Sequence, residues 1–432
     1  MRGSWTLLLG MPLLVAQTFT AGVAKIDLEP PLGIPMSGYQ VRLATGRHDP
    51  IEARVLAISD GRRRVAIVTL DLCFPFEPAA MEEIRSAVRT QVDEVIFHAS
   101  HTHSGPTYMA APEALKAAIP RVATAIREAA GGMRAARIGT GWGQTSIGFN
   151  RRSVRPDGAV HMFWRNEQKM GGMFPVDPTV GVIRVDRADS GAPLAVLVHY
   201  ACHPVIFGPD NLDYSADYPH QMRLGVEEAM PGSMAFFLQG APGDINPYFD
   251  KTPKIEDAEA VMRATGRKLA AEAVRVARTI QTRPATSIRS KTVIVTARNR
   301  WNIEKLKAVA EERYHLDPLR AARLLRDDMQ LPVTTLLIDD SIALAGMPGE
   351  PFVEFQMQLR AQSPVAASFL IGYTNGYFAY FPTIAAAVRG GYGANSTVNP
   401  TEVGVGESLL NTALISLYEL LGKLKPEMEV AK

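Results

Sequence analysis

The sequence predicts an α/β protein in which mixed β-sheets are flanked by helices. Short runs rich in valine, isoleucine and leucine alternate with longer stretches of helical periodicity, a pattern typical of buried strands covered by helices. The runs at residues 53–58 and 65–70 are joined by a short turn at Asp60-Gly61. Their strands should therefore pair antiparallel, and this makes the sheets mixed rather than wholly parallel.

The individual elements follow from these runs and periods. The predicted strands are residues 22–28, 53–58, 65–70, 94–99, 180–185, 195–201, 234–238, 288–295, 335–338, 342–345 and 368–371. The predicted helices are residues 78–89, 112–130, 219–228, 255–279, 303–314, 318–329, 351–360 and 407–424. No repeat, low-complexity tract or long linker divides the 432 residues, so we expect one large domain over residues 19–432.

Composition excludes some classes of function. The formal net charge is only +2, and the one basic run, Arg62-Arg63-Arg64, is expected to flank a hairpin turn. A nucleic-acid partner is therefore not expected. The two cysteines, Cys73 and Cys202, form no Cys-x-x-Cys unit. Buried thiols are the default reading, and a bridge between them stays open.

The N-terminus indicates a cellular location. Arg2 is followed by an almost entirely apolar stretch over residues 5–16, which resembles a signal peptide and is too short for a membrane span. We expect residues 1–18 to be a signal peptide and the protein to be exported, either periplasmic or secreted. The alternative is a cytoplasmic enzyme with a short apolar lead. No other stretch is long enough to cross a bilayer, so no transmembrane span is expected.

The tripeptide His101-Thr102-His103 is the strongest chemical signal in the chain. It follows the predicted strand at residues 94–99, and Ser104-Gly105-Pro106 ends that strand. In extended backbone, side chains at i and i+2 share one face, so the two imidazoles can converge at the end of a strand. Such a pair suits a divalent metal, either as two ligands or as one ligand beside a base. The alternative is two ordinary loop histidines.

Four other loops carry side chains that could bind a metal or take part in catalysis. Taken singly, each has a structural reading: a core histidine, an Asx turn, a first-turn acid or packed tyrosines. Because all of them follow predicted strands, together they indicate a site at the ends of the sheets. They are His203-Pro204, the stretch 239–247 with Gly243-Asp244-Ile245-Asn246, Pro348-Gly349-Glu350, and the tyrosine-rich stretch 372–393.

In combination these motifs resemble the neutral ceramidase family, which are zinc amidases that split the N-acyl bond of ceramides. The resemblance runs from Gly22 to about Gly406. Its motifs are the opening at 22–28 with 35–39, Arg-His-Asp-Pro-Ile-Glu-Ala-Arg at 47–54, His-Thr-His-Ser-Gly-Pro at 101–106, Ala-Cys-His-Pro at 201–204, Pro-Gly-Glu at 348–350, and Asn375-Gly-Tyr377 to Tyr380. The resemblance implies a single catalytic domain of the neutral ceramidase type.

The resemblance also implies a site, residue by residue. It assigns four zinc ligands, a histidine that handles protons, an arginine at the substrate and a tyrosine near the developing oxyanion. The implied zinc ligands are His101, His203, Glu350 and Tyr380; the other implied residues are His103, Arg151 and Tyr392, in that order.

The implied chemistry is that of a hydrolytic zinc site. Neutral imidazoles and a carboxylate suit Zn²⁺, which lowers the pKa of a bound water to about 7. Where the family has a serine required for activity, this chain has Asn246. An amide is no serine-like nucleophile, so we expect attack by zinc-activated water, with Asn246 orienting water or substrate. The chain also leaves no room for the family's C-terminal β-sandwich.

The expected substrate is a small-molecule or lipid N-acyl compound, and ceramide is the first named candidate. Cleavage of an ester in place of the amide stays open, and so does contact with a membrane surface.

Two alternative functions remain. A catalytically silent metal-containing binding protein is supported by Asn246. A (β/α)8 zinc amidohydrolase also uses His-x-His at a strand end, although usually on its first strand. A metallo-β-lactamase pattern is broken at Ser104-Gly105-Pro106.

Overall fold

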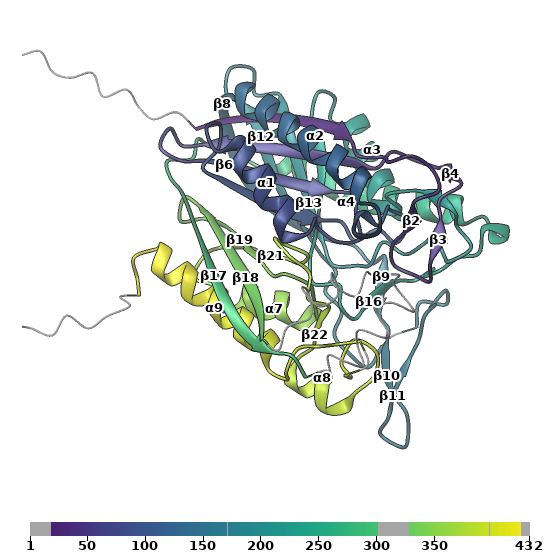
Figure 1. The fold of residues 1–432 in the computed structure, drawn as a ribbon. Coiled ribbons are helices and arrows are strands. Elements are labelled where there is room, and N and C mark those ends of the chain that lie inside the picture. The colour runs from purple at the N-terminus through teal and green to yellow at the C-terminus, as the bar shows by residue number, and fades with distance from the viewer. Residues whose placement is uncertain (1–18, 171, 301–327, 397, 425–432) are drawn as a thin grey trace, which may run out of the picture.

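The computed structural model describes residues 19–170, 172–300, 328–396 and 398–424. Its largest sheet has eight strands in the order β15-β13-β12-β8-β1-β5-β6-β7. Figure 1 labels β6, β8, β12 and β13 of this sheet. The pairs β6–β7 and β13–β15 are parallel and the other pairs are antiparallel. The strands are β1 (Thr20–Asp27), β5 (Glu52–Ser59), β6 (Arg64–Leu70), β7 (Glu94–Ala99), β8 (Arg134–Gln144), β12 (Thr179–Arg187), β13 (Pro193–Tyr200) and β15 (Met234–Gln239).

A second sheet has four strands in the order β17-β18-β19-β21. Only its β19–β21 pair is parallel. The mixed α/β fold is thus confirmed, and the (β/α)8 alternative is wrong, because that fold requires eight parallel strands. The strands are β17 (Ile288–Arg298), β18 (Asp328–Ile338), β19 (Ile342–Gly346) and β21 (Ala367–Ile371).

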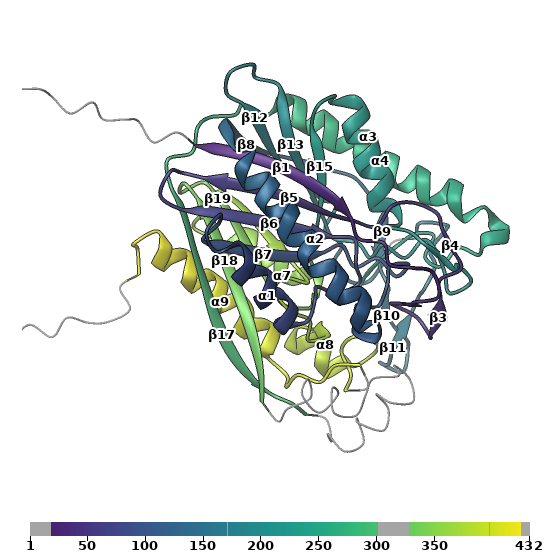
Figure 2. The same cartoon turned by 45° about the horizontal axis from the view of Figure 1, so that its top comes forward.

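The two sheets pack face to face, and helices cover both outer faces (Figure 2). Leu56 and Ile58 of β5 share one core with Leu336 of β18, Leu344 of β19 and Phe369 of β21. The other face of the large sheet packs against α1 (Pro78–Val88), α2 (Pro112–Gly131), α3 (Tyr218–Ala229) and α4 (Ala258–Thr279). The outer face of the small sheet packs against α7 (Val353–Gln362) and α9 (Val405–Leu420). This makes four layers, in which strands buried on both faces read as continuous apolar runs.

The predicted elements recur with small shifts at their ends. The described helices that were predicted begin and end within four residues of the predicted bounds, and each predicted strand coincides with an observed one. These helices are α1 (Pro78–Val88), α2 (Pro112–Gly131), α3 (Tyr218–Ala229), α4 (Ala258–Thr279), α7 (Val353–Gln362) and α9 (Val405–Leu420). The short elements are β2 (Pro35–Met36), β3 (Arg42–Leu43), β4 (Gly46–Arg47), β9 (Gly148–Asn150), β10 (Arg152–Val154), β11 (Val160–Met162), β14 (Asp213–Tyr214), β16 (Ile245–Pro247), β20 (Glu350–Pro351), β22 (Tyr380–Phe381), α8 (Ile384–Arg389) and two 3-10 turns, Tyr108–Ala110 and Lys254–Glu256.

Three predicted segments lie wholly or mostly outside the described residues. They are the signal peptide at residues 1–18, the helix at 303–314 and most of the helix at 318–329. The end of that last helix is wrong, because Asp328 and Met329 belong to β18 and pair with Arg298 and Ala297 of β17. Long-range pairing has overridden the local helical pattern here.

One central strand, β8, is absent from the predicted set because its alternate residues are glycines. An added Cβ at Gly139 would lie 2.5 Å from the Gln281 carbonyl oxygen. At Gly141 it would lie 2.8 Å from a Val276 methyl carbon, and at Gly143 it would lie 2.1 Å from a Glu272 carboxylate oxygen. The glycines therefore let α4 and the segment that follows it approach the sheet closely. A sequence with this composition resembles a loop.

The hairpin and cysteine expectations are now settled. Ser59 of β5 pairs with Arg64 of β6, so the arginine run flanks the hairpin turn as predicted. Cys73 and Cys202 are both buried and free, so the disulfide bond between them, which the sequence left open, does not form.

Among the helices of the described ranges, none combines the length and the apolar character that a bilayer crossing requires.

Candidate active site

Three side chains from distant loops meet in the interior of the molecule. His101 follows β7, His203 follows β13, and Glu350 follows β19. Their candidate ligand atoms all lie within 4.8 Å of one another. The Nε2 atom of His203 is 3.0 Å from one Glu350 oxygen, and that of His101 is 3.7 Å from the other. All three residues are buried, so the structure brings together three of the four predicted metal ligands.

Backbone carbonyl groups orient both imidazoles. The Nδ1 atom of His101 is 2.7 Å from the Cys73 oxygen, and that of His203 is 2.9 Å from the Ile245 oxygen. Since a carbonyl only accepts, each Nδ1 carries the hydrogen, and Nε2 of a neutral ring keeps its lone pair. Burial lowers the pKa of His101 to about 4, so its ring is neutral at pH 7.

Two nitrogen lone pairs and a carboxylate would repel one another without a positive charge between them. A cation relieves that repulsion, and two imidazoles with one carboxylate form a donor set that suits Zn²⁺. The residues present therefore fit a zinc ion.

The backbone at His101 differs from the extended geometry predicted for it. Strand β7 ends at Ala99, and His101 has a left-handed φ of 69°. The strand alternation expected to align the two histidines is therefore wrong, although their Nε2 atoms do converge to 3.2 Å. A left-handed non-glycine residue costs about 1–3 kcal/mol. The His101 amide, which donates to the Leu72 oxygen at 2.9 Å, and ring stacking on Tyr373 at 4.2 Å hold this conformation.

A short parallel ladder places Tyr380 beside Glu350. Strands β20 and β22 pair these two residues directly. The hydroxyl that contacts the carboxylate, however, is that of Tyr377, which donates to Glu350 at 2.7 Å. Burial acts to raise the pKa of Glu350, but the imidazoles of His101 and His203 and the Tyr377 hydroxyl outweigh it and hold the pKa at about 2. Tyr377 was not assigned a role, although it lies within the Asn-Gly-Tyr motif.

His103 lies against the same cluster. Its Nε2 atom is 3.2 Å from that of His101, and its ring meets Tyr39 edge-on at 4.8 Å. Gly38 permits this approach, because it has a φ of 93° and an added Cβ would lie 2.2 Å from His103 Cγ. Burial, together with the neighbouring His101 and His203, lowers the pKa of His103 well below its usual value. His103 is thus a neutral base within reach of the cluster.

A second ladder unites Arg151 with Asn246. Strand β9 pairs with β16, and Arg151 directly follows β9. Its guanidinium donates to the Asn246 side-chain oxygen at 3.0 Å and to the Gly243 oxygen at 2.6 Å, while the Asn246 nitrogen donates to Asp250 at 2.6 Å. Arginine only donates and a carboxylate only accepts, so the amide can sit in one orientation only. Asn246 therefore bridges a cation and an anion.

Aromatic rings surround the Arg151 guanidinium. The centroids of Trp164, Tyr380 and Tyr392 lie 5.5, 5.7 and 5.2 Å from its central carbon. Arg151 is 3% exposed, whereas Tyr392 and Trp164 are 37% and 39% exposed. The site thus extends from buried polar groups to the partly exposed rings of Trp164 and Tyr392, which we call the aromatic mouth. Lys251 lies there too, with its ammonium nitrogen 4.4 Å from the Trp164 ring centroid. No motif in the sequence had indicated Trp164 or Lys251.

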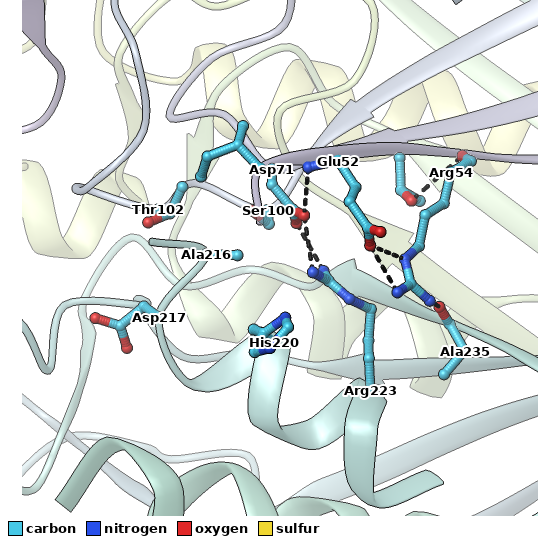
Figure 3. Close-up of polar contacts among 12 residues, drawn as sticks. Glu52, Arg54, Asp71, Ser100, Thr102, Ala216, Asp217, His220, Arg223 and Ala235 are labelled. Carbon is cyan, nitrogen blue, oxygen red and sulfur yellow. Dashed lines mark hydrogen bonds and ion pairs between the residues drawn. The ribbon is translucent and has the colours of Figure 1, made fainter. Parts of the chain in front are cut away.

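A buried ionic network supports the loop behind His101 (Figure 3). Arg223, on α3, points its guanidinium at Asp71 and donates two hydrogen bonds of 2.6 and 2.7 Å. Glu52 lies beside Arg54, and its backbone amide donates to Asp71 at 3.0 Å. The two residues after Asp71 supply the carbonyl oxygens that hold His101. The network therefore fixes the end of β6 from which His101 is oriented.

No family model matches this chain. Its structure resembles the crystal structure of neutral ceramidase from Pseudomonas aeruginosa with a TM-score of 0.74, covering 96% of this chain and 76% of that chain at 18% sequence identity. A ceramidase complexed with C2 gives a TM-score of 0.74 and 18% identity, with 96% of this chain and 77% of that chain covered. The fold of this chain is therefore the neutral ceramidase fold, as predicted.

Proposed function

We propose that this protein is a zinc-dependent hydrolase that cleaves an N-acyl amide bond, as a ceramidase does. The observation that carries the proposal is the convergence of His101, His203 and Glu350, with both imidazoles held so that their lone pairs face the carboxylate. We propose Tyr380, which pairs with Glu350, as the fourth ligand. The fold shared with two ceramidase structures supports the reaction class.

Water is the proposed nucleophile, because Asn246 offers no hydroxyl and both ends of its amide are engaged. A bound zinc ion would polarise the scissile carbonyl and lower the pKa of water. His103, a neutral base beside the cluster, would accept a proton from the water and return it to the leaving nitrogen. Arg151 and Tyr392 would hold the developing oxyanion, and losing one such donor typically costs about 10²–10³ in rate.

The substrate proposed for this site is a lipid or small-molecule N-acyl compound. The aromatic mouth formed by Trp164 and Tyr392 suits an apolar acyl chain. The two structural neighbours are named as ceramidases, so ceramide is the first candidate to assay. We also propose export, on the basis of the apolar N-terminal stretch, and contact with a membrane surface when the substrate is a lipid.

The test combines metal analysis with a hydrolysis screen. Purified protein should hold about one zinc ion per chain and release fatty acid from ceramides, N-acyl amino acids or simple esters. A chelator should abolish the release, and added zinc should restore it. His203→Ala should lose both zinc and activity, whereas His161→Ala, which removes an imidazole bonded to Arg155 outside the ligand cluster, should lose neither.

Two outcomes would contradict the proposal. Undiminished zinc content in His203→Ala would remove the assigned metal centre. Zinc-loaded protein that cleaves none of the three substrate classes would instead favour a catalytically silent metal-containing binding protein.

A further inference from the structure

Lys251 places a positive charge at the aromatic mouth. Its ammonium group lies 4.4 Å from the Trp164 ring centroid and 2.6 Å from the Asp250 carboxylate. The Lys251 side chain is 30% exposed, whereas that of Asp250 is fully buried. Asp250 also accepts the hydrogen bond from Asn246, which in turn accepts from Arg151. A continuous polar chain therefore joins the mouth to the interior of the site.

Two further cationic side chains lie in this part of the site. Arg151 donates to an amide and a carbonyl, and among the described residues no carboxylate is hydrogen-bonded to it. Arg42 donates to the His103 carbonyl oxygen and to other backbone carbonyl oxygens. Cationic side chains gathered at a partly buried site favour an anionic ligand.

We propose that Lys251 is a specificity-determining residue that binds a carboxylate on the amine fragment of the substrate, so that the enzyme prefers N-acyl amino acids to neutral ceramides. This inference rests on the proposed function. An acyl chain is apolar, so any charged group of an N-acyl substrate lies on its amine fragment. An ammonium has three hydrogens, and Asp250 accepts only one of the three in this structure. Because the Lys251 side chain is 30% exposed, the ammonium group remains accessible to a ligand carboxylate.

The decisive experiment compares substrates that share one acyl chain. N-acylglycine carries a carboxylate, N-acylethanolamine is a neutral analogue of similar size, and ceramide is neutral and larger. We expect the highest kcat/KM with N-acylglycine. Lys251→Gln should lower kcat/KM for N-acylglycine about 10- to 100-fold, the range for losing a charge-assisted hydrogen bond, while changing that for N-acylethanolamine less than about twofold.

Two further variants control for local disturbance. Lys251→Arg keeps the charge and should retain most of the preference. Lys169→Gln makes the same chemical change at a lysine that also has a left-handed φ and also lies over an aromatic ring, that of Tyr248, but on an exposed segment. This variant should change kcat/KM for neither N-acylglycine nor N-acylethanolamine. Unchanged cleavage of N-acylethanolamine by Lys251→Gln also shows that this variant is folded.

The outcomes separate this inference from the proposed function. Equal or faster cleavage of N-acylethanolamine or ceramide by the unmodified protein would overturn the role of Lys251 and leave the hydrolase intact. If Lys251→Gln lowered kcat/KM equally for all substrates, the role of Lys251 would also be overturned and the hydrolase would stand. If zinc-loaded protein cleaves nothing, the function fails. Binding of N-acylglycine and N-acylethanolamine, measured by calorimetry with and without Lys251→Gln, then decides whether the mouth selects an anion.

Discussion

Replacing Arg223 tests how the ionic network behind the site stabilises the fold. The Asp71–Arg223 pair has two short hydrogen bonds, and its side chains are only 4% and 3% exposed. Arg223→Met would leave Asp71 buried with one remaining hydrogen-bond donor among the described residues, the Glu52 amide. Breaking a buried pair by removing one partner costs about 3–5 kcal/mol, mainly because the remaining charge is uncompensated.

The expected shift in melting temperature follows from the size of the chain. With 432 residues and about 2.1 cal/mol/K per residue, the entropy of unfolding is about 0.9 kcal/mol/K. Arg223→Met should therefore lower the midpoint of thermal unfolding, followed by circular dichroism, by about 3–6 °C. The matched control is Arg267→Met, which breaks an exposed pair with Glu228 and should shift the midpoint by about 1 °C or less.

A double variant identifies the source of the loss. Asp71→Asn combined with Arg223→Met removes both charges, so it should recover most of the stability lost in Arg223→Met. The reasoning would be refuted if Arg223→Met melted like the Arg267→Met control. It would also be refuted if the double variant were no more stable than Arg223→Met, because the unpaired charge would then not be the cause.

Three further predictions follow from the site and its support. Glu350→Gln removes the anion that faces the two imidazoles, and it should weaken zinc binding by more than about 100-fold in a competition assay; unchanged affinity would exclude Glu350 as a ligand. Gly38→Ala should displace the His103 ring, since the new Cβ would lie 2.2 Å from His103 Cγ, and we expect kcat to fall about 10- to 100-fold with zinc content unchanged; full activity would contradict a role for the ring. The pKa of Glu52 is about 2, because Arg54 and other cations outweigh the burial that would raise it. A carboxyl with a depressed pKa in the native state stabilises the fold above its unfolded pKa, so about 3 kcal/mol should be lost as the pH falls from 4.5 to 2; chemical denaturation across this range should show a shallower loss in Glu52→Gln, and an equal slope would be inconsistent with the assignment.

Much of the site could be predicted because the residue types themselves indicate which side chains can bind a metal or transfer a proton. His101, His203 and Glu350 lie at strand ends whose apolar runs are visible in the sequence, and the structure brings all three together. Arg151 and Asn246 were also selected from separate motifs, and the β9–β16 ladder makes them neighbours. What could not be predicted is how their polar atoms are used. Asn246 is expected to orient water or substrate, and the structure adds that its amide bridges a guanidinium and a carboxylate.

The sequence by itself determined most of the helices and strands, the mixed α/β class and the chemical identity of the candidate ligands, since apolar periodicity and residue type are local properties of the chain. Only the tertiary structure decided that the glycine-rich β8 is a central strand, that His101 adopts a left-handed conformation, and that the Tyr377 hydroxyl reaches Glu350. It also decided that Lys251 and Trp164 share the mouth of the site. These features depend on backbone torsions and on the packing of segments far apart in sequence, which no local pattern records.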